Sequence, residues 1–551
     1  MKRTVLNLPL RLLAPLLLAA GIGLAAGCTP GVRVYAPKAQ PTIDRSDAEF
    51  PTGLELRVVA TNFTAATALA TDDAGFIYVA DEGVRGKEVR ITRVDPSTGS
   101  EVEVYPARRA IVSWFDKRPR LYGPIGGMAF RDGELFASAR DATDAGVVVA
   151  FDLSEWPTEL TSRPPMRTVV GQLPAQGDHG VTALAFHPVT GRLFFGVGSA
   201  TNSGVVGLDN WEMGWVGIHR GFHDQPLLNL KINGFRFDTE DPTAGFLNPE
   251  KVNTAPFNAF GQSTQRIPAE ANGKPTAAIY SVDPRGGDLR VEAHGIRMAA
   301  GLAFNDFANL YASNQGMELR GTRPVKDDPD AILRIFTVSG SDVAAWYGWP
   351  DYSADLRPIT SPSLQPPRQL LARTGYAELS SLIDTTANVG RESPRALTPP
   401  DRATLLAATF PALSGASGMA FVPRGAAGFE DLAGQLVVAL RGDRAPFATS
   451  GLPLREPQGR YVAIVDPDRG TTNPFVLNTV PAGKQAAEDP LKRPVAVAFG
   501  RDGAMWILDG GTMRMRGGEE RHRPGTGQLL RLASPDATTP ATRPAAEADG
   551  D

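Results

Sequence analysis

The sequence predicts an all-β fold, a closed β-propeller of six blades with four antiparallel strands each. Three observations lead to this prediction: one short phrase recurs six times, a further strand follows each copy, and turn-forming residues are abundant. The chain contains 58 glycines and 46 prolines among 551 residues, as expected where many short strands are joined by turns.

The recurring phrase consists of a short apolar strand, a polar turn with Asp or Gly, and a second apolar strand. β-Branched and aromatic residues on both sides of such a turn are typical of a β-hairpin. The copies occupy residues 68–80, 128–139, 184–197, 302–313, 419–439 and 497–509. The six copies therefore predict six hairpins.

A third strand is predicted after each hairpin, at residues 91–96, 147–153, 278–284, 332–338, 461–467 and 528–533. A hairpin cannot bury both faces alone, so the units must stack, and radial stacking gives a propeller. Residues 54–60 precede the first copy and are expected to complete the last blade, which closes the ring and hides the sheet edges. A β-sandwich or two separate β domains are the alternatives, and the even recurrence of one phrase disfavours both.

Segments outside the repeats complete the organisation of the chain. The propeller is expected to span residues 54–533, with insertions at about 205–277 and 352–411. Long insertions between blades lie on the faces of a propeller, where they shape binding sites. A helix is expected near residues 376–383, and residues 534–551 are expected to form a disordered tail.

The first 27 residues have the pattern of an export signal, with a basic head and an apolar run at 12–26 that is too short to span a bilayer. The run ends in Leu24-Ala25-Ala26-Gly27-Cys28, which resembles a bacterial lipoprotein cleavage box, although Leu24 lies one place further out than usual. This resemblance implies a lipid on Cys28, a tether at residues 28–53, and a periplasmic location in the cell envelope, with the outer membrane favoured. An ordinary signal peptide that ends at a chance cysteine is the alternative.

Composition excludes several classes of function. Cys28 is the only cysteine of the sequence, which rules out an intramolecular disulfide, a thiolate zinc cluster and a haem-attachment motif. The net charge is −4 and no long block of Lys or Arg occurs, so the sequence disfavours a nucleic-acid partner, whose phosphates require cationic surfaces.

Seven short phrases follow one another in a specific order from the second blade onward. They are Asp178-His179, Gly295-Ile296-Arg297, Gly301-Leu302-Ala303-Phe304, Ser313-Asn314-Gln315-Gly316, Tyr347-Gly348-Trp349-Pro350, Ser417-Gly418-Met419-Ala420-Phe421 and Arg493-Pro494-Val495. In this order they resemble the glucose/sorbosone dehydrogenase family, six-bladed propellers that oxidise sugars with pyrroloquinoline quinone (PQQ).

The resemblance implies an exported oxidoreductase that oxidises a sugar hydroxyl or aldehyde hydrate by hydride transfer to PQQ. His179 matches the general base, a role that suits imidazole because its ordinary pKa lies near 6.5. Asp178 is expected to hold the ring of His179 or to raise its basicity. Arg297 matches an arginine that stabilises charge on the reduced quinone. Since the sequence has no haem motif, the electrons would pass to a separate acceptor.

The resemblance also implies sites for the cofactor and for Ca²⁺. Gln315 and Gly316 match a loop that touches the quinone, and the carbonyl groups of Gly316 and Met317 match the calcium site. Cations for the three carboxylates of PQQ would come from Arg441 and from Lys492 or Arg493.

Three departures from the family pattern leave alternatives open. Met298 and Ala299 stand where the family has Asn and Pro, and Met317 stands where the glucose enzymes have Pro. The lost Asn would remove a cofactor contact, which favours a non-catalytic envelope propeller that binds carbohydrate or a protein partner. A third possibility is a metal-dependent lactonase-like propeller, for which the sequence assigns no axial Glu, Asn and Asp cluster.

Overall fold

A computed structural model describes residues 34–35, 40–84, 89–105, 120–154, 156, 164–244, 250–263, 269–337, 344–374, 378–384, 397–454, 456–480 and 489–535. The predicted export signal and Cys28 lie outside the described residues. Within the described part of the chain, no helix is both long and apolar enough to cross a membrane.

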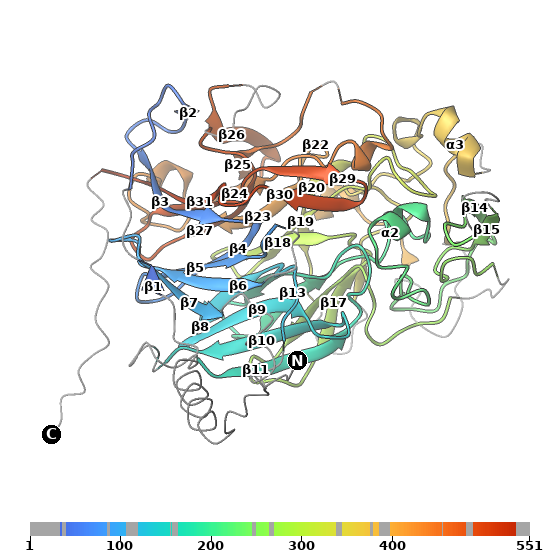
Figure 1. Cartoon of the computed structure of the whole chain (residues 1–551), viewed down its shortest axis with the longest axis horizontal. Helices are drawn as coiled ribbons and strands as arrows, with labels where there is room; N and C mark the ends of the chain where they lie inside the picture. The colour runs from blue at the N-terminus through green and yellow to red at the C-terminus, as the bar shows by residue number, and fades with distance from the viewer. Residues whose placement is uncertain are drawn as a thin grey trace, which may run out of the picture.

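Six antiparallel sheets, each with four core strands, form the body of the molecule (Figure 1). Blades one and two consist of β4 (Ala66–Thr71), β5 (Ile77–Asp81), β6 (Arg90–Val94), β7 (Glu101–Tyr105), and β8 (Met128–Arg131), β9 (Glu134–Arg140), β10 (Gly146–Asp152), β11 (Met166–Leu173). Blades three and four consist of β12 (Val181–Phe186), β13 (Leu193–Val197), β16 (Ala278–Val282), β17 (Arg290–His294), and β18 (Ala299–Phe304), β19 (Leu310–Asn314), β20 (Pro329–Ile335), β22 (Leu406–Ala412). Blades five and six consist of β23 (Ala416–Phe421), β24 (Leu436–Leu440), β25 (Tyr461–Asp466), β26 (Thr471–Asn478), and β27 (Pro494–Phe499), β28 (Met505–Asp509), β31 (Gly527–Ala533), β3 (Glu55–Phe63).

The first strands of the blades form a closed circuit. β4 contacts β8, and the contacts continue through β12, β18, β23 and β27 back to β4. Each first strand pairs with the second strand of its blade, so the six predicted hairpins and the propeller fold are confirmed. The N-terminal strand β3 pairs with β31 of the last blade, with Leu56 opposite Leu532. The ring is therefore closed by strands from the two ends of the propeller, as predicted.

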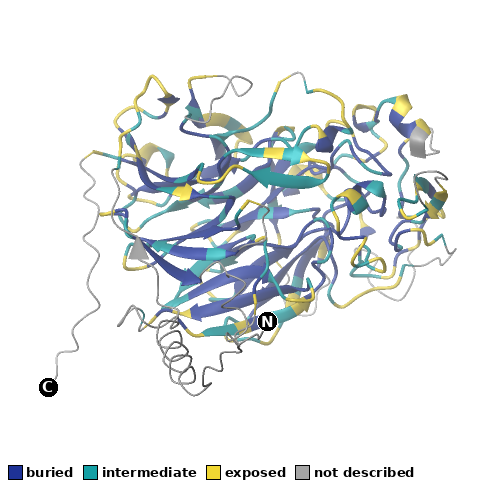
Figure 2. Ribbon diagram, viewed as in Figure 1, coloured by how far each residue is buried: buried dark blue, intermediate teal, exposed yellow. Residues whose placement is uncertain are grey.

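The apolar core lies between neighbouring blades, where buried strand residues are concentrated (Figure 2). One cluster joins Phe63 of β3 and Trp506 of β28 to Val79 of blade one, each at most 1% exposed. Because burial of apolar surface is the main favourable contribution to folding, the closure between blades six and one contributes directly to stability.

The two long insertions pack on one another beside the ring. The first contains α2 (Leu208–Glu212) and the hairpin of β14 (Phe237–Glu240) and β15 (Lys251–Thr254), and the second contains η1 (Pro362–Leu364), α3 (Arg368–Thr374) and α4 (Arg402–Leu405). Ile232 and Ile383 form a β-bridge between them and share one buried cluster.

Two expectations for the second insertion need correction. The helix is α3, and the described residues 378–383 of the segment expected to be helical contain none. The end of the range 352–411 belongs to β22, the fourth strand of blade four.

Part of the segment expected to be a tether packs on the propeller instead of hanging from it. Residues 48–49 form β2 (Ala48–Glu49), which pairs with β26. Ala48 is fully buried and Phe50 is 8% exposed.

A hairpin inserted between β28 and β31 reaches from blade six toward the first insertion (Figure 1). It consists of β29 (Met513–Arg516) and β30 (Glu519–His522), and we call residues 513–522 the axial hairpin. Its tip lies against the end of α2, where a Cβ added to Gly518 would lie 2.6 Å from the carbonyl carbon of Glu212. Glycine permits this close approach of two backbones. The N–H of His522 donates to the carbonyl of Val84 at 3.0 Å, so the hairpin also contacts blade one.

Candidate functional site

The topology explains why distant site residues meet. In each blade the first strand begins where the second strand ends, because the two strands are antiparallel. His179, Arg297 and Arg493 lie one or two residues before the first strands of their blades, and Gln315 and Arg441 directly follow second strands. All five therefore lie at the same end of the propeller axis, which we call the mouth.

Hydrogen bonds link these residues from blade three to blade five. The carbonyl of Arg297 accepts the N–H of Ser199 at 2.8 Å, and Nη1 of Arg297 lies 3.5 Å from the carbonyl oxygen of Gln315. The side chain of Gln315 donates to the carbonyl of Ala416 at 2.8 Å and accepts from Nη2 of Arg441 at 3.0 Å. The structure thus brings together Arg297, Gln315 and Arg441, three of the residues predicted from the sequence. Ser199 contacts both His179 and Arg297, so His179 lies next to this group.

His179 is 5% exposed and has the properties of a neutral base. Its Nδ1 lies 3.0 Å from the carbonyl oxygen of Ser199. A carbonyl oxygen can only accept, so Nδ1 carries the proton and Nε2 keeps its lone pair. Burial, together with the charges of Arg297, Arg444 and Arg320, lowers the pKa of His179 well below its ordinary value. Nε2 is buried and has no hydrogen-bond partner among the described residues.

Asp178 does not have the role expected for it. Its carboxylate accepts hydrogen bonds from Asn210 at 2.8 Å, from Nε1 of Trp215 at 2.7 Å and from Nη2 of Arg320 at 2.7 Å. These bonds direct the carboxylate toward α2 and Arg320, while the ring of His179 is held by Ser199. The expectation that Asp178 orients the imidazole is therefore corrected: Asp178 supports the site through Arg320.

Arg297 is 2% exposed and is held in place by Asn202. Its Nε donates to the carbonyl of Asn202 and its Nη2 to the side-chain oxygen of Asn202, both at 3.1 Å. Burial lowers the pKa of Arg297 to about 10, so the guanidinium stays charged at neutral pH. The site therefore holds a fixed cation beside His179.

Glu318 lies at the centre of an ionic cluster that no motif of the sequence predicts. Its carboxylate accepts from Arg320 and from Arg444, the latter at 2.6 Å, and lies 3.9 Å from Nη2 of Arg297. Arg320 also pairs with Asp178 and Asp209. Burial raises the pKa of Glu318, but the charges of Arg444, Arg320 and Arg297 outweigh this effect and hold it well below its ordinary value.

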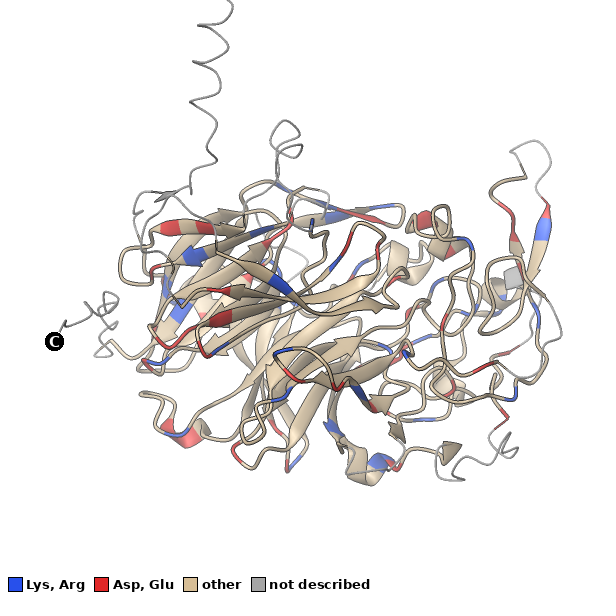
Figure 3. Cartoon of the chain, turned by 90° about the horizontal axis from the view of Figure 1, so that it is seen from below, with Lys and Arg blue, Asp and Glu red and all other residues tan. Residues whose placement is uncertain are grey.

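Charged residues are usually exposed, so Glu318 and Arg320 look like ordinary surface residues in the sequence. Their position within four residues of Gly316 is the one signal that could have found them. Elsewhere in the described part of the molecule, acidic and basic residues are interspersed (Figure 3).

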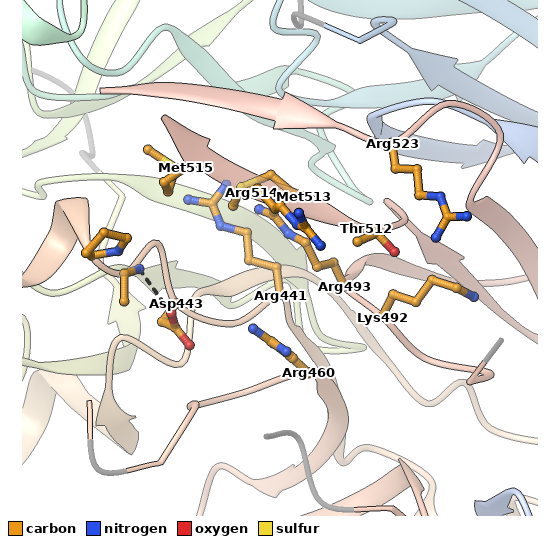
Figure 4. A pocket seen from close by; sticks show the side chains of 12 residues that line it. Arg441, Asp443, Arg460, Lys492, Arg493, Thr512, Met513, Arg514, Met515 and Arg523 are labelled. Atoms are coloured by element: carbon orange, nitrogen blue, oxygen red, sulfur yellow. Dashed lines mark hydrogen bonds between the residues drawn. The ribbon is translucent and has the colours of Figure 1, made fainter. Parts of the chain in front are cut away.

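A cavity of about 520 Å³ opens beside this cluster, between blades five and six and the axial hairpin. Figure 4 shows its lining residues: Arg441, Asp443, Ala445, Pro446, Arg460, Lys492, Arg493, Thr512, Met513, Arg514, Met515 and Arg523. All three cations expected to face the carboxylates of PQQ are therefore present in one cavity. His179, Arg297 and Gln315 do not line it, and the side chain of Gln315 connects the two regions through Arg441.

Arg493 is buried and Arg441 is half-buried, and each has a buried N–H group that no described residue accepts. Arg493 is 7% exposed, and its Nη1 lies 3.6 Å from the carboxylate of Glu520, too far for a hydrogen bond. Nη1 of Arg493 and Nε of Arg441 have no hydrogen-bond partner within the described part of the chain. Burial lowers the pKa of Arg441 to about 10. Buried guanidinium groups are stable when they are paired, so the cavity fits a ligand with several carboxylates.

The predicted calcium site rests on carbonyl oxygens alone. The N–H groups of Gly316 and Met317 donate to Asp330 at 2.9 Å and to Asp328 at 2.7 Å. Burial raises the pKa of Asp328 to about 7 and that of Asp330 to about 6. Met317 is 2% exposed in an apolar cluster with Trp349. No group of three or more His, Cys, Asp or Glu residues among those described could hold a metal ion.

Comparisons with known proteins return solved structures only. No family model matches the sequence, and no curated protein matches it. A carbohydrate-active enzyme of family AA12 from Trichoderma reesei has a TM-score of 0.49 and 14% identity, covering 89% of this chain and 98% of its own. The PQQ-bound aldose sugar dehydrogenase of Streptomyces coelicolor has a TM-score of 0.44 and 17% identity, covering 88% and 100%. The PQQ domain of pyranose dehydrogenase from Coprinopsis cinerea has a TM-score of 0.47 and 13% identity, covering 90% and 98%.

Proposed function

We propose that the protein is an exported sugar or aldose dehydrogenase that uses PQQ. The observation that carries this proposal is the cationic cavity, in which Arg441 and Arg493 each have a buried N–H group without a partner among the described residues. The side chain of Gln315 accepts a hydrogen bond from Arg441, and its carbonyl oxygen lies next to the guanidinium group of Arg297, so Gln315 connects the cavity with Arg297. The order of the family-like phrases in the sequence is consistent with it.

Each residue has a defined part in the proposed reaction. PQQ, when bound, supplies the two-electron oxidant. Arg441, Lys492 and Arg493 would bind its carboxylates, and Arg297 would place a fixed positive charge where negative charge develops. His179 accepts the proton of the sugar hydroxyl at Nε2, because Ser199 holds the proton of the ring at Nδ1.

The electrons leave through a separate acceptor, and the substrate is a small sugar. Calcium belongs to the proposal only through the carbonyl groups of Gly316 and Met317. Adding Ca²⁺ during reconstitution and then removing it with a chelator tests this part separately.

The test is reconstitution of the purified protein with PQQ, followed by reduction of an artificial electron-accepting dye with a panel of aldoses. We expect turnover that is lost in His179→Ala. The control is His187→Ala, which changes a histidine at the opposite end of β12. The proposal fails if PQQ does not bind and no aldose reduces the dye.

A non-catalytic propeller that binds carbohydrate or a protein partner is the second candidate. It is favoured by the position of His179, whose Nε2 is buried and which does not line the cavity. If this candidate is right, ligand binding occurs without dye reduction and is insensitive to His179→Ala.

Export and lipid attachment complete the proposal, on the basis of the pattern of residues 1–28. We expect the protein in the cell envelope, on the periplasmic side, anchored through Cys28. Fractionation of cells that express Cys28→Ser tests the anchor: the variant should leave the membrane fraction, and its retention there would contradict the lipid.

A further inference from the structure

The cavity carries more positive charge than the carboxylates of the proposed cofactor require. Six cationic side chains line it: Arg441, Arg460, Lys492, Arg493, Arg514 and Arg523. Among the described residues that line it, the one carboxylate belongs to Asp443, which accepts main-chain N–H groups from Ala445 at 3.0 Å and from Gln458 at 3.4 Å. Arg441, Lys492 and Arg493 are the cations that would face the carboxylates of PQQ in the proposal above, and Arg514 and Arg523 are two further cations of the lining.

These two further cations belong to the axial hairpin or follow it directly. Arg514 lies in β29 and Arg523 is the first residue after β30 (Figure 4). Both are exposed, while Met513 and Met515 of the same wall are partly buried. The hairpin thus adds two solvent-accessible guanidinium groups to a cavity whose floor holds the buried Arg493.

The acidic residues of the hairpin do not neutralise the charges of Arg514 and Arg523. Glu520 lies 3.6 Å from Arg493 and 3.4 Å from Nε2 of His522, so its charge is directed toward the interior. Glu519 pairs with Arg521 at 2.6 Å. Arg514 and Arg523 therefore remain available for an anionic group of a ligand.

We propose that the sugar bound at this site is acidic, a uronic acid or its oligomer, with a carboxylate held by Arg514 and Arg523. This inference rests on the proposed dehydrogenase function for the identity of the reaction. The planar guanidinium group matches a carboxylate with two parallel hydrogen bonds, which a neutral hydroxymethyl group cannot make.

The carboxylate takes no part in the oxidation. In the proposed oxidation the C–H and O–H bonds at the anomeric carbon would break, His179 would take the proton, bound PQQ would serve as the acceptor of the hydride, and the sugar would become a lactone. The carboxylate of the sugar serves only for binding and selectivity.

Matched sugar pairs test the proposal, because glucuronate and glucose, or galacturonate and galactose, differ only at C6. We expect kcat/KM for the uronate to exceed that for the neutral sugar by about 10-fold or more at low salt, since each factor of ten requires only about one charge-assisted contact. The preference should decrease as NaCl screens the charges. The double variant Arg514→Gln/Arg523→Gln should bring the ratio close to 1.

The matched control is Arg516→Gln, another exposed arginine of β29 that does not line the cavity. It should retain the preference for the uronate. Equal kcat/KM values for acidic and neutral sugars in the unmodified protein would overturn the inference while leaving the dehydrogenase proposal intact.

A binding experiment distinguishes failure of the acidic-sugar inference from failure of the dehydrogenase proposal. Calorimetric titration of the protein without PQQ with digalacturonate requires no turnover, and binding that is lost in the double variant supports the acidic ligand even if no sugar is oxidised. Absence of digalacturonate binding, or equally tight binding of tripolyphosphate, would contradict the assignment to an acidic sugar.

Discussion

The substitution Glu318→Gln removes a negative charge that three guanidinium groups share in the interior. Glu318 is 7% exposed, Arg297 and Arg320 are at most 2% exposed, and the side chain of Arg444 is 10% exposed. Removing one partner of a buried ion pair costs about 3–5 kcal/mol, because the other charge stays buried without compensation. Arg320 retains Asp178 and Asp209, so we expect a loss near the lower limit, about 3 kcal/mol of unfolding free energy at pH 7.

The loss should depend on pH in a defined direction. The pKa of Glu318 is held well below its ordinary value of 4.5. A carboxyl group whose pKa is lower in the folded protein contributes stability above its unfolded pKa and loses it as the pH falls through the folded pKa. The difference between the unmodified protein and Glu318→Gln should therefore be largest at neutral pH and should shrink below about pH 4.

Urea unfolding followed by tryptophan fluorescence at several pH values measures this difference. The control is Glu134→Gln, which breaks the half-exposed pair with Arg167 and should cost at most about 1 kcal/mol. A loss below about 1 kcal/mol for Glu318→Gln at pH 7, or a loss that does not change with pH, would refute the reasoning.

Three further predictions follow from the fold and from the titratable groups at the mouth. In β3, Leu56→Ala should lower the free energy of unfolding by about 2–5 kcal/mol, because Leu56 is fully buried where the ring closes. The control Arg57→Ser, on the exposed side of the same strand, should change it by about 0.5 kcal/mol. Urea unfolding of the two variants measures the difference. Burial raises the pKa of Glu82 to about 8, so stability of the unmodified protein should fall as pH rises from about 4.5 through 8, and Glu82→Gln should lack this fall; thermal unfolding at pH 5 and pH 9 decides. The pH profile of kcat/KM for the best sugar should show no loss near pH 6.5, since burial and Arg297 lower the pKa of His179, and His179→Ala should lose about 100-fold or more; a loss centred at pH 6.5 would contradict an imidazole buried in this way.

The strands could be predicted because alternation of apolar and polar residues is local. Each predicted hairpin and each third strand matches strands of the structure, and residues 54–60 lie in β3. The helix expected near residues 376–383 illustrates where local patterns fail. Leu379, Leu382 and Ile383 have helical spacing and are at most 4% exposed, but none of them lies in a helix. Leu382 and Ile383 pack against the first insertion, and Leu379 packs in a separate cluster with Met317 and Trp349. The helical spacing of these apolar residues reflects their burial in the tertiary structure, not a helix.

The candidate site was predictable only in part. The order of short phrases indicates His179, Arg297 and Gln315, the family resemblance adds Arg441, and the structure places all four at one mouth. Asp178 is next to His179 along the chain, yet its carboxylate pairs with Arg320, which lies 142 residues away. Arg444 pairs with Glu318 across 126 residues, a relation that no local pattern reveals.

The sequence by itself determined the number of blades, the approximate position of each hairpin and the strand that follows it. Only the tertiary structure decided which charges pair at the mouth, and that the axial hairpin adds Arg514 and Arg523 to the cavity. The physical reason is the range of the interactions. Strand formation depends on neighbouring residues and on the polarity of alternate positions, whereas a buried ion pair depends on distances between blades that exist only after the ring has closed.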